Sequence, residues 1–495
     1  MSQLSLTEGN VRRALSRFAI PFLGASLLQF LYGAVDLIVV GQFADQAGIA
    51  AVSTGSQVMQ AVTNFIIGLS TGGTVLVGQY LGARRGEDVN RAIGTLFSLF
   101  ALIAVVLAAA FALSTNAIVA LMQVPAAAVG PARQYLFICA CGLVFITGYN
   151  MVSGVLRGLG DSKRPMYFVL VACIINIVGD LLLVGVFGLG AAGAALATVA
   201  AQGVSLALAL AVLRRRDFPF DFKRRSFRIQ GDKAARILRL GLPVAVQNVL
   251  VTLSFLIITA IVNHMDVLAQ SAAVGLVERI TGFIMLFPIA FQSAISAMTA
   301  QNMGAGRPDR ARQGLKYGIL FCLAADIAMF VLVQLVPGLA MRLFTPDAEV
   351  IYHGVLYLRT YSIDCILVTF VFTLNGFYSG CGRTGFTLFN SLASTFLVRV
   401  PAVFFISLLP GVTLLHIGVA APAASAIQVL LQLLYFRTGR WNHSVLGEAQ
   451  TEVLAFLGGA PGPISLFEAW EEAVLACGES TMKVSKTQIS WGNPL

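Results

Sequence analysis

Two short stretches that lie far apart in the chain decide the fold, 78-GQYLGARR-85 and 301-QNMGAGRPDRA-311. In each stretch a glutamine is followed by Gly-Ala at the third and fourth positions and by arginine at the sixth. An offset of 222 residues relates the matching positions, which are Gln79 and Gln301, Gly82 and Gly304, and Arg85 and Arg307. The pairing indicates that the chain contains the same structural unit twice.

The same offset continues on both sides of these stretches. It relates Pro21 to Pro243 and Tyr135-Leu136 to Tyr357-Leu358. The glycines of GVLRGLG in the first half and of GFYSGCG in the second are related in the same way. One offset therefore holds over about 140 residues without a gap, which indicates an internal duplication.

The composition indicates a membrane protein. Of the 495 residues, 57% are hydrophobic and only 11% are charged, whereas soluble proteins carry about 25% charged residues. Apolar stretches long enough to cross a hydrocarbon core of about 30 Å recur along the chain. We predict transmembrane helices at roughly 15–40, 49–78, 92–113, 131–157, 166–188, 191–213, 236–262, 271–300, 314–336, 351–379, 386–409 and 414–437.

Twelve helices and one duplication define the expected architecture, an all-α polytopic membrane protein. Each repeat has six helices, an even number, so both repeats run the same way through the membrane. Transporters with such parallel repeats place the substrate between two lobes, which rock to give alternating access. We expect an N-terminal lobe at 1–213, a linker at 214–235, a C-terminal lobe at 236–438 and a poorly ordered tail at 439–495.

The positive charges are distributed unevenly. The formal net charge is +10, and 26 of the 33 Lys and Arg lie in the N-terminal segment, after even-numbered helices or in the linker. Basic residues concentrate on the cytoplasmic side of membrane proteins, so we expect both termini to be cytoplasmic and the chain to lie in the cell (inner) membrane. A nucleic-acid partner would require one basic face with a recognition motif, and none is present.

Other chemistry finds little support in the sequence. The seven cysteines are scattered without metal-ligand or disulfide spacing. The motifs HExxH, GxSxG and Walker A are absent, so we expect no enzyme, no cofactor and no ATP-binding domain. Energy for transport would then come from an ion gradient or from another subunit.

The sharpest candidate site lies in the first lobe. Tyr32 and Asp36 are four residues apart and share one face of the first predicted helix, as Asn176 and Asp180 do on the fifth. Thr198 on the sixth helix has a similar depth. Two carboxylates in a dry pocket cannot both ionise cheaply, so the group is expected to bind H⁺ or Na⁺. The alternative for Asp36 is an acid at the membrane interface, because its helix is predicted to end nearby.

The second lobe also contains charges within its predicted helices. Glu278, Asp326 and Asp364 are candidate partners for Arg399, and each charge is costly in a bilayer. The adjacent Glu278 and Arg279 point in different directions and are not expected to pair. A substrate contact and a structural ion pair remain alternatives for this group.

These residues and motifs resemble the multidrug and toxic compound extrusion (MATE) family, in particular its prokaryotic DinF-like branch. The resemblance covers about 12–438 and rests on 20-IPFLGASLLQFLYGAVDLIVVGQF-43, on the paired Gly-Ala-Arg endings, and on the glycine-rich loops after helices four and ten. It implies export of organic, often cationic or amphipathic, compounds in exchange for H⁺ or Na⁺. It also implies that Tyr32, Asp36, Asn176, Asp180 and Thr198 line a cation-coupling cavity, and Pro21 matches a helix-kinking proline of the family.

Two other functions are alternatives to export. A flippase for lipid-linked sugars belongs to the same superfamily, but it would need several basic residues in its cavity, and only Arg279, Arg359 and Arg399 lie within predicted helices. An intramembrane enzyme has no catalytic motif to support it. We therefore expect a monomeric antiporter whose partners are small organic substrates and the lipid bilayer.

Overall fold

The computed structural model describes residues 6–214, 218–264, 268–442, 444–446, 481–484 and 489–492. Within these residues it contains twelve helical spans that are long and apolar enough to cross a membrane. The first six are α1 (Val11–Phe43), α2 (Gln46–Gly82), α3 (Gly86–Leu121), η1 (Ala126–Ala128) continued by α4 (Val129–Gly158), α5 (Lys163–Asp180) continued by the π-helix η2 (Leu181–Val186), and α6 (Gly190–Leu213).

The second half repeats this arrangement after a short 3₁₀ helix in the linker, η3 (Arg224–Phe227). Its elements are α7 (Gly231–Asn263), α8 (Leu268–Ile284) with α9 (Leu286–Gly304), α10 (Pro308–Leu335), α11 (Pro337–Arg342), α12 (Ala348–Tyr361) with α13 (Ile363–Gly380), α14 (Thr384–Leu392) with the π-helix η4 (Ala393–Arg399) and α15 (Val400–Ser407), and α16 (Leu414–Gly418) with α17 (Ala420–Arg437). The prediction of twelve spanning helices is confirmed.

Several helices extend beyond their predicted ends. α3 continues to Leu121, past the predicted end at 113, and α7 begins at Gly231 rather than at 236. Hydropathy detects only the segment that faces hydrocarbon, whereas a helix continues until its end groups are capped. At the start of α1, for example, the Asn10 side chain accepts a hydrogen bond of 3.2 Å from the Arg13 amide.

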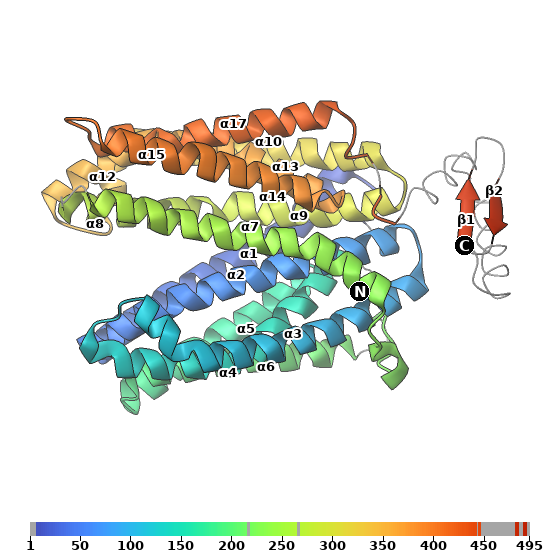
Figure 1. The fold of residues 1–495 in the computed structure, drawn as a ribbon, viewed down its shortest axis with the longest axis horizontal. Helices are drawn as coiled ribbons and strands as arrows, with labels where there is room; N and C mark the ends of the chain where they lie inside the picture. The colour runs from blue at the N-terminus through green and yellow to red at the C-terminus, as the bar shows by residue number, and fades with distance from the viewer. Residues whose placement is uncertain are drawn as a thin grey trace.

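The helices form two groups that come together at one end of the molecule (Figure 1). We call this the linker end, because the even-numbered spans end there and the linker joins α6 to α7 there. The opposite end of the molecule is the far end. The first half of α1, with Leu15 and Phe18, packs in the core of the second lobe against residues such as Ile295. Beyond Pro21, which lies inside the helix, α1 contributes Ala25 to the core of the first lobe.

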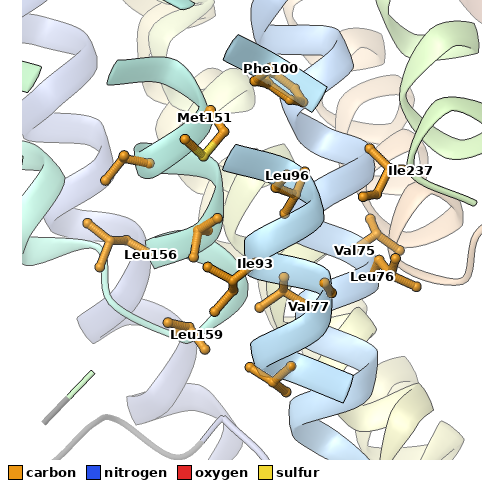
Figure 2. Packing of buried hydrophobic residues seen from close by; sticks show 14 of the residues in the cluster. Val75, Leu76, Val77, Ile93, Leu96, Phe100, Met151, Leu156, Leu159 and Ile237 are labelled. Carbon is orange, nitrogen blue, oxygen red and sulfur yellow. The ribbon is translucent and has the colours of Figure 1, made fainter. Parts of the chain in front are cut away.

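α7 crosses between the lobes in the corresponding way. Its Ile237 lies in the first-lobe core beside Leu76 of α2 and Leu96 of α3 (Figure 2). Pro243 lies inside α7 at the position that matches Pro21. Each lobe is therefore completed by the start of a helix from the other half of the chain.

The two lobes are in backbone contact where α2 crosses α9. A Cβ atom on Gly82 would lie 1.9 Å from the carbonyl oxygen of Gln301, and one on Gly304 would lie 2.0 Å from the carbonyl oxygen of Gln79. Any side chain at either glycine would force the helices apart. The two stretches quoted from the sequence, around Gly82 and Gly304, therefore form the two sides of one helix crossing.

The linker folds back onto the first lobe. Phe220 stacks on Phe97 of α3 with ring centroids 5.6 Å apart, and Phe222 and Phe227 contact the same ring. A Cβ on Gly94 of α3 would lie 1.7 Å from the carbonyl oxygen of Ser226, so only glycine permits this approach. The linker, which the sequence indicated only as polar and basic, thus covers a surface of α3 with aromatic rings.

The part of the chain after α17 continues the packing. Trp441 is buried against Phe377 and Phe436, and Leu446 reaches the first-lobe core. Strands β1 (Thr481–Val484) and β2 (Ile489–Gly492) form an antiparallel pair in which Thr481 faces Gly492. The expected poor order of the tail concerns residues that for the most part lie outside those described.

Replacing Gly94 with valine is expected to displace the linker. The new side chain collides with the Ser226 carbonyl, and overpacking of this kind typically costs about 1–3 kcal/mol. Limited trypsin digestion should then cut the basic linker around Arg225 and Arg228 faster than in the wild type. Gly86→Ala, where no atom lies within 4 Å of the new Cβ, is the control. Equal cleavage of wild type and Gly94→Val would contradict this packing.

Candidate functional site

The predicted site residues of the first lobe lie in the far-end halves of their helices. Asp36 lies in the last third of α1, and Asp180 is the last residue of α5 before the π-helix η2 begins. Such π-helical segments are frequent at functional sites, because one extra residue per turn rotates a side chain away from its regular position. Thr198 lies on α6, which packs against α5.

The structure brings the five predicted residues together. The Asn176 amide nitrogen donates to the Thr198 hydroxyl at 3.3 Å, and the Tyr32 hydroxyl lies within hydrogen-bonding reach of the same Thr198. The carboxyl groups of Asp36 and Asp180 are within hydrogen-bonding reach of each other. One carboxyl can donate to the other only when a proton sits between them.

The acids and the amide of this group are buried inside the lobe. Asp36 is 7% exposed, and Asn176 and Asp180 are 0% exposed. The Asp36 side chain therefore points into the lobe and not toward its surface.

Several oxygen atoms of the site have no hydrogen-bond donor among the described residues. They are Oδ1 of Asp36, Oδ1 of Asn176 and both carboxylate oxygens of Asp180. Buried oxygens are normally satisfied, because a buried acceptor without a partner costs about 1–3 kcal/mol. Carboxylate and carbonyl oxygens gathered in one place are the ligands that hard cations prefer. The residues present therefore fit a proton or an alkali cation.

Two neighbours of the site were missed by the sequence analysis. Tyr135 and Cys139 are buried, lie one turn apart on α4, and are within electrostatic reach of Asp36. In the sequence, Cys139 is one of the scattered cysteines without metal or disulfide spacing, and Tyr135 marks the repeat. The i, i+4 spacing of two hydroxyl or thiol groups on α4 was the signal available in the sequence.

The charges of the second lobe form two separate groups. Arg399, the last residue of η4, stacks over Phe255 with its guanidinium carbon 4.5 Å from the ring centroid and donates to the Tyr361 hydroxyl at 3.2 Å. The carboxyl groups of Asp364 and Glu278 lie near enough to Arg399 to attract it electrostatically. Among the described residues, however, neither forms an ion pair with it within 4.0 Å. Arg399 is thus held mainly by aromatic rings.

Asp326 does not belong to this group. Its Oδ2 accepts hydrogen bonds from the Thr369 hydroxyl and from the Cys322 thiol, the latter at 3.4 Å. Arg279 lines a groove of about 540 Å³ beside Phe30 and Phe283, whereas the adjacent Glu278 faces Arg399. The expectation that these two neighbours point in different directions agrees with this arrangement.

One buried arginine was not singled out from the sequence. Arg157 is 8% exposed, although the sequence places it at the predicted end of helix four. Its Nη2 donates to the Ser70 hydroxyl at 3.2 Å, and its guanidinium lies over Phe22 of α1. It is far along α4 from Tyr135 and lies at the linker end of the lobe.

Comparison with known proteins agrees with the fold. The model of the family described as MatE matches residues 21–182 and 243–405, two segments that start at Pro21 and Pro243 and so follow the internal repeat. A relative from Bacillus subtilis named "Probable multidrug resistance protein YoeA" is 29% identical over 440 residues, which are 87% of this chain and 94% of that protein.

A second relative is "Probable multidrug resistance protein NorM" from Thermotoga maritima, 24% identical over 87% of this chain and 93% of that protein. Among solved structures, one described as the outward-facing conformation of a multidrug resistance MATE family transporter of the MOP superfamily has a TM-score of 0.83 at 22% identity. It covers 88% of this chain and 98% of that chain, which shows that the fold is shared.

The family match covers both repeats and well over half of the chain. Together with the twelve spanning helices and the duplicated lobes, it confirms the resemblance to the MATE family and a multi-pass membrane protein that is no enzyme. The chain belongs to the MatE family of multidrug efflux transporters.

Proposed function

We propose that the chain is an antiporter that exports organic, often cationic or amphipathic, compounds in exchange for H⁺ or Na⁺, and that the first-lobe aspartates couple the two movements. The orphaned oxygens of Asp36, Asn176 and Asp180 carry this proposal. In a dry lobe, two adjacent carboxylates can both remain ionised only if a cation compensates their charge. Cation binding therefore neutralises the lobe, and cation loss restores a negative site.

Exchange follows from this charge balance. A cationic substrate and the coupling cation compete to neutralise the same carboxylates, so binding of one favours release of the other. The Thr198 hydroxyl accepts a hydrogen bond from Asn176 and lies close to Tyr32, so three helices meet at the site. Movement of any of these helices would change the cation ligands, which is how a change of conformation would be linked to cation binding.

The contacts between the lobes support alternating access. Gln79 donates to the carbonyl of Gly380 at 2.9 Å, and Gln301 donates to the carbonyl of Gly158 at 2.8 Å. These two bonds join the lobes in opposite directions and are related by the 222-residue offset. We infer that they close the linker end, which the excess of basic residues assigns to the cytoplasm, while the helices diverge toward the far end (Figure 1).

Among the described residues, further hydrogen bonds reinforce this end on the Gln79 side. The Oε1 atom of Gln79 also accepts from the Ser444 hydroxyl at 2.9 Å and from the Val445 amide at 2.8 Å. The segment after α17 therefore fastens onto the first-lobe glutamine. Gln79 and Gln301 occupy equivalent positions in the repeat, but among the described residues Gln79 makes more hydrogen bonds.

The flippase alternative receives less support from this geometry. The buried Arg157 and the half-buried Arg399 lie in different lobes, and each is held by rings and hydroxyl groups. A pyrophosphate group would need converging basic side chains, and the described residues do not provide them at one place.

Neutralising either aspartate is expected to uncouple transport. Asp36→Asn and Asp180→Asn each remove a charge that the cation must compensate, so dye efflux from proteoliposomes should fall to background under either a pH or a Na⁺ gradient. The gradient that drives the wild type identifies the coupling ion. Glu87→Gln removes a carboxylate that is 81% exposed and should leave efflux unchanged. Wild-type efflux rates in both aspartate variants would overturn the coupling proposal.

Removing the glutamine side chains is expected to open the linker end. A buried hydrogen bond contributes about 1 kcal/mol, equivalent to roughly a fivefold change in population. Among the described residues, Gln79→Ala loses three hydrogen bonds and Gln301→Ala loses one, so the effect should be larger for Gln79. Spin-label distances between the linker-end tips of α3 and α10 should report the opening. Identical distance distributions in the wild type and both variants would count against a latch.

A further inference from the structure

The second lobe has an apolar groove on its outer surface. It has a volume of about 480 Å³ and lies over α13, between α10 and α17. Leu367 and Phe370 of α13 form its floor, Ile319 lies on one wall and Leu433 on the other. These four side chains offer hydrocarbon surface along the whole length of the groove.

Basic residues stand at the linker end of this groove. Arg312 and Lys316, one turn apart on α10, line it and are both exposed. Arg312 lies over the ring of Trp441 with its guanidinium carbon 4.8 Å from the centroid, and it pairs with the exposed Asp309 at 3.2 Å. Tryptophan and basic residues at such a position are typical of the boundary between hydrocarbon and lipid headgroups.

The first lobe has an equivalent surface on α3, which the linker covers. The 222-residue offset relates Ile319 to Phe97 and Lys316 to Gly94. In the first lobe the linker covers this position, with Phe220 stacked on Phe97 and the Ser226 carbonyl against Gly94. Within the part of the chain that the structure describes, the same surface is thus covered by aromatic side chains in one lobe and left as a groove in the other.

We propose that the second-lobe groove binds an anionic phospholipid, with an acyl chain along Ile319, Phe370 and Leu433 and the phosphate beside Arg312 and Lys316. The lipid covers in the second lobe what the linker covers in the first. Basic pockets between membrane helices are suited to anionic headgroups, and each basic residue contributes about fivefold in affinity. This site is separate from the first-lobe aspartates and does not depend on the proposed coupling.

The depth of the groove favours a lipid over a segment of protein. Leu367 lies thirteen residues before Gly380, the end of α13, which corresponds to about 20 Å along the helix. That depth lies well inside a hydrocarbon core of about 30 Å. A non-helical peptide segment would bring unsatisfied backbone groups into hydrocarbon, whereas an acyl chain brings none.

Native mass spectrometry of the detergent-purified full chain tests the proposal, with phosphatidylglycerol and phosphatidylcholine as probes. The wild type is expected to retain phosphatidylglycerol in preference to phosphatidylcholine. The double variant Arg312→Gln/Lys316→Gln should bind phosphatidylglycerol about thirtyfold more weakly. Ile319→Trp keeps both charges but fills the groove, and it should also lose the lipid. Thermal unfolding of each variant establishes that it is folded.

Two matched variants separate this site from other effects. Arg225→Gln/Arg228→Gln removes two exposed charges from the linker of the first lobe and should keep the retained lipid. Asp36→Asn should also keep it, even though its transport is lost. Any one of three results would overturn the proposal. They are unchanged phosphatidylglycerol binding in the Arg312/Lys316 variant, an equal loss of binding in the Arg225/Arg228 variant, and no preferential retention of phosphatidylglycerol by the wild type.

Discussion

The backbone contact between α2 and α9 is the constraint on which the two-lobe arrangement depends. Gly82 and Gly304 let each helix approach the other until a carbonyl oxygen occupies the place of a side chain. This approach brings Gln79 and Gln301 within reach of carbonyls in the opposite lobe. In a bilayer, where apolar side chains gain little from leaving lipid, close packing and hydrogen bonds must supply the association. A crossing built from two glycines and two amide hydrogen bonds can hold the lobes together and still separate.

The closed linker end and the aspartate site occupy different depths of the same helices. α2 carries the crossing, and α1 joins the second-lobe core through Phe18 while it carries Asp36 toward the far end. A rotation of the lobes about the crossing would therefore move α1 relative to α5 and α6, which supply Asp180 and Thr198. In the proposed mechanism, cation binding and lobe movement are therefore linked through a single helix, and Pro21 lies where that helix passes from one lobe to the other.

Much of this organisation could be predicted from the sequence, because hydropathy and the 222-residue offset report the spans and the repeat directly. The convergence of Asp36, Asp180, Asn176 and Thr198 followed from their spacing and depth. The exchange of α1 and α7 between lobes could not be predicted, since an apolar helix face does not specify which lobe it packs against. The separation of Asp326 from Arg399 depends on helix rotation, which hydropathy does not encode. Arg157 could be recognised only as one of the basic residues at the end of an even-numbered helix, because burial at a helix end depends on neighbours such as Phe22.

The central claim is that the paired carboxylates of the first lobe hold one exchangeable cation. Cation release on addition of a cationic substrate tests it most directly, measured on purified protein in weakly buffered solution with a pH electrode for H⁺ and radioactive sodium for Na⁺. The account predicts release of about one cation per chain from the wild type and none from the double variant Asp36→Asn/Asp180→Asn. Equal release from both proteins would show that the exchanged cation is held elsewhere.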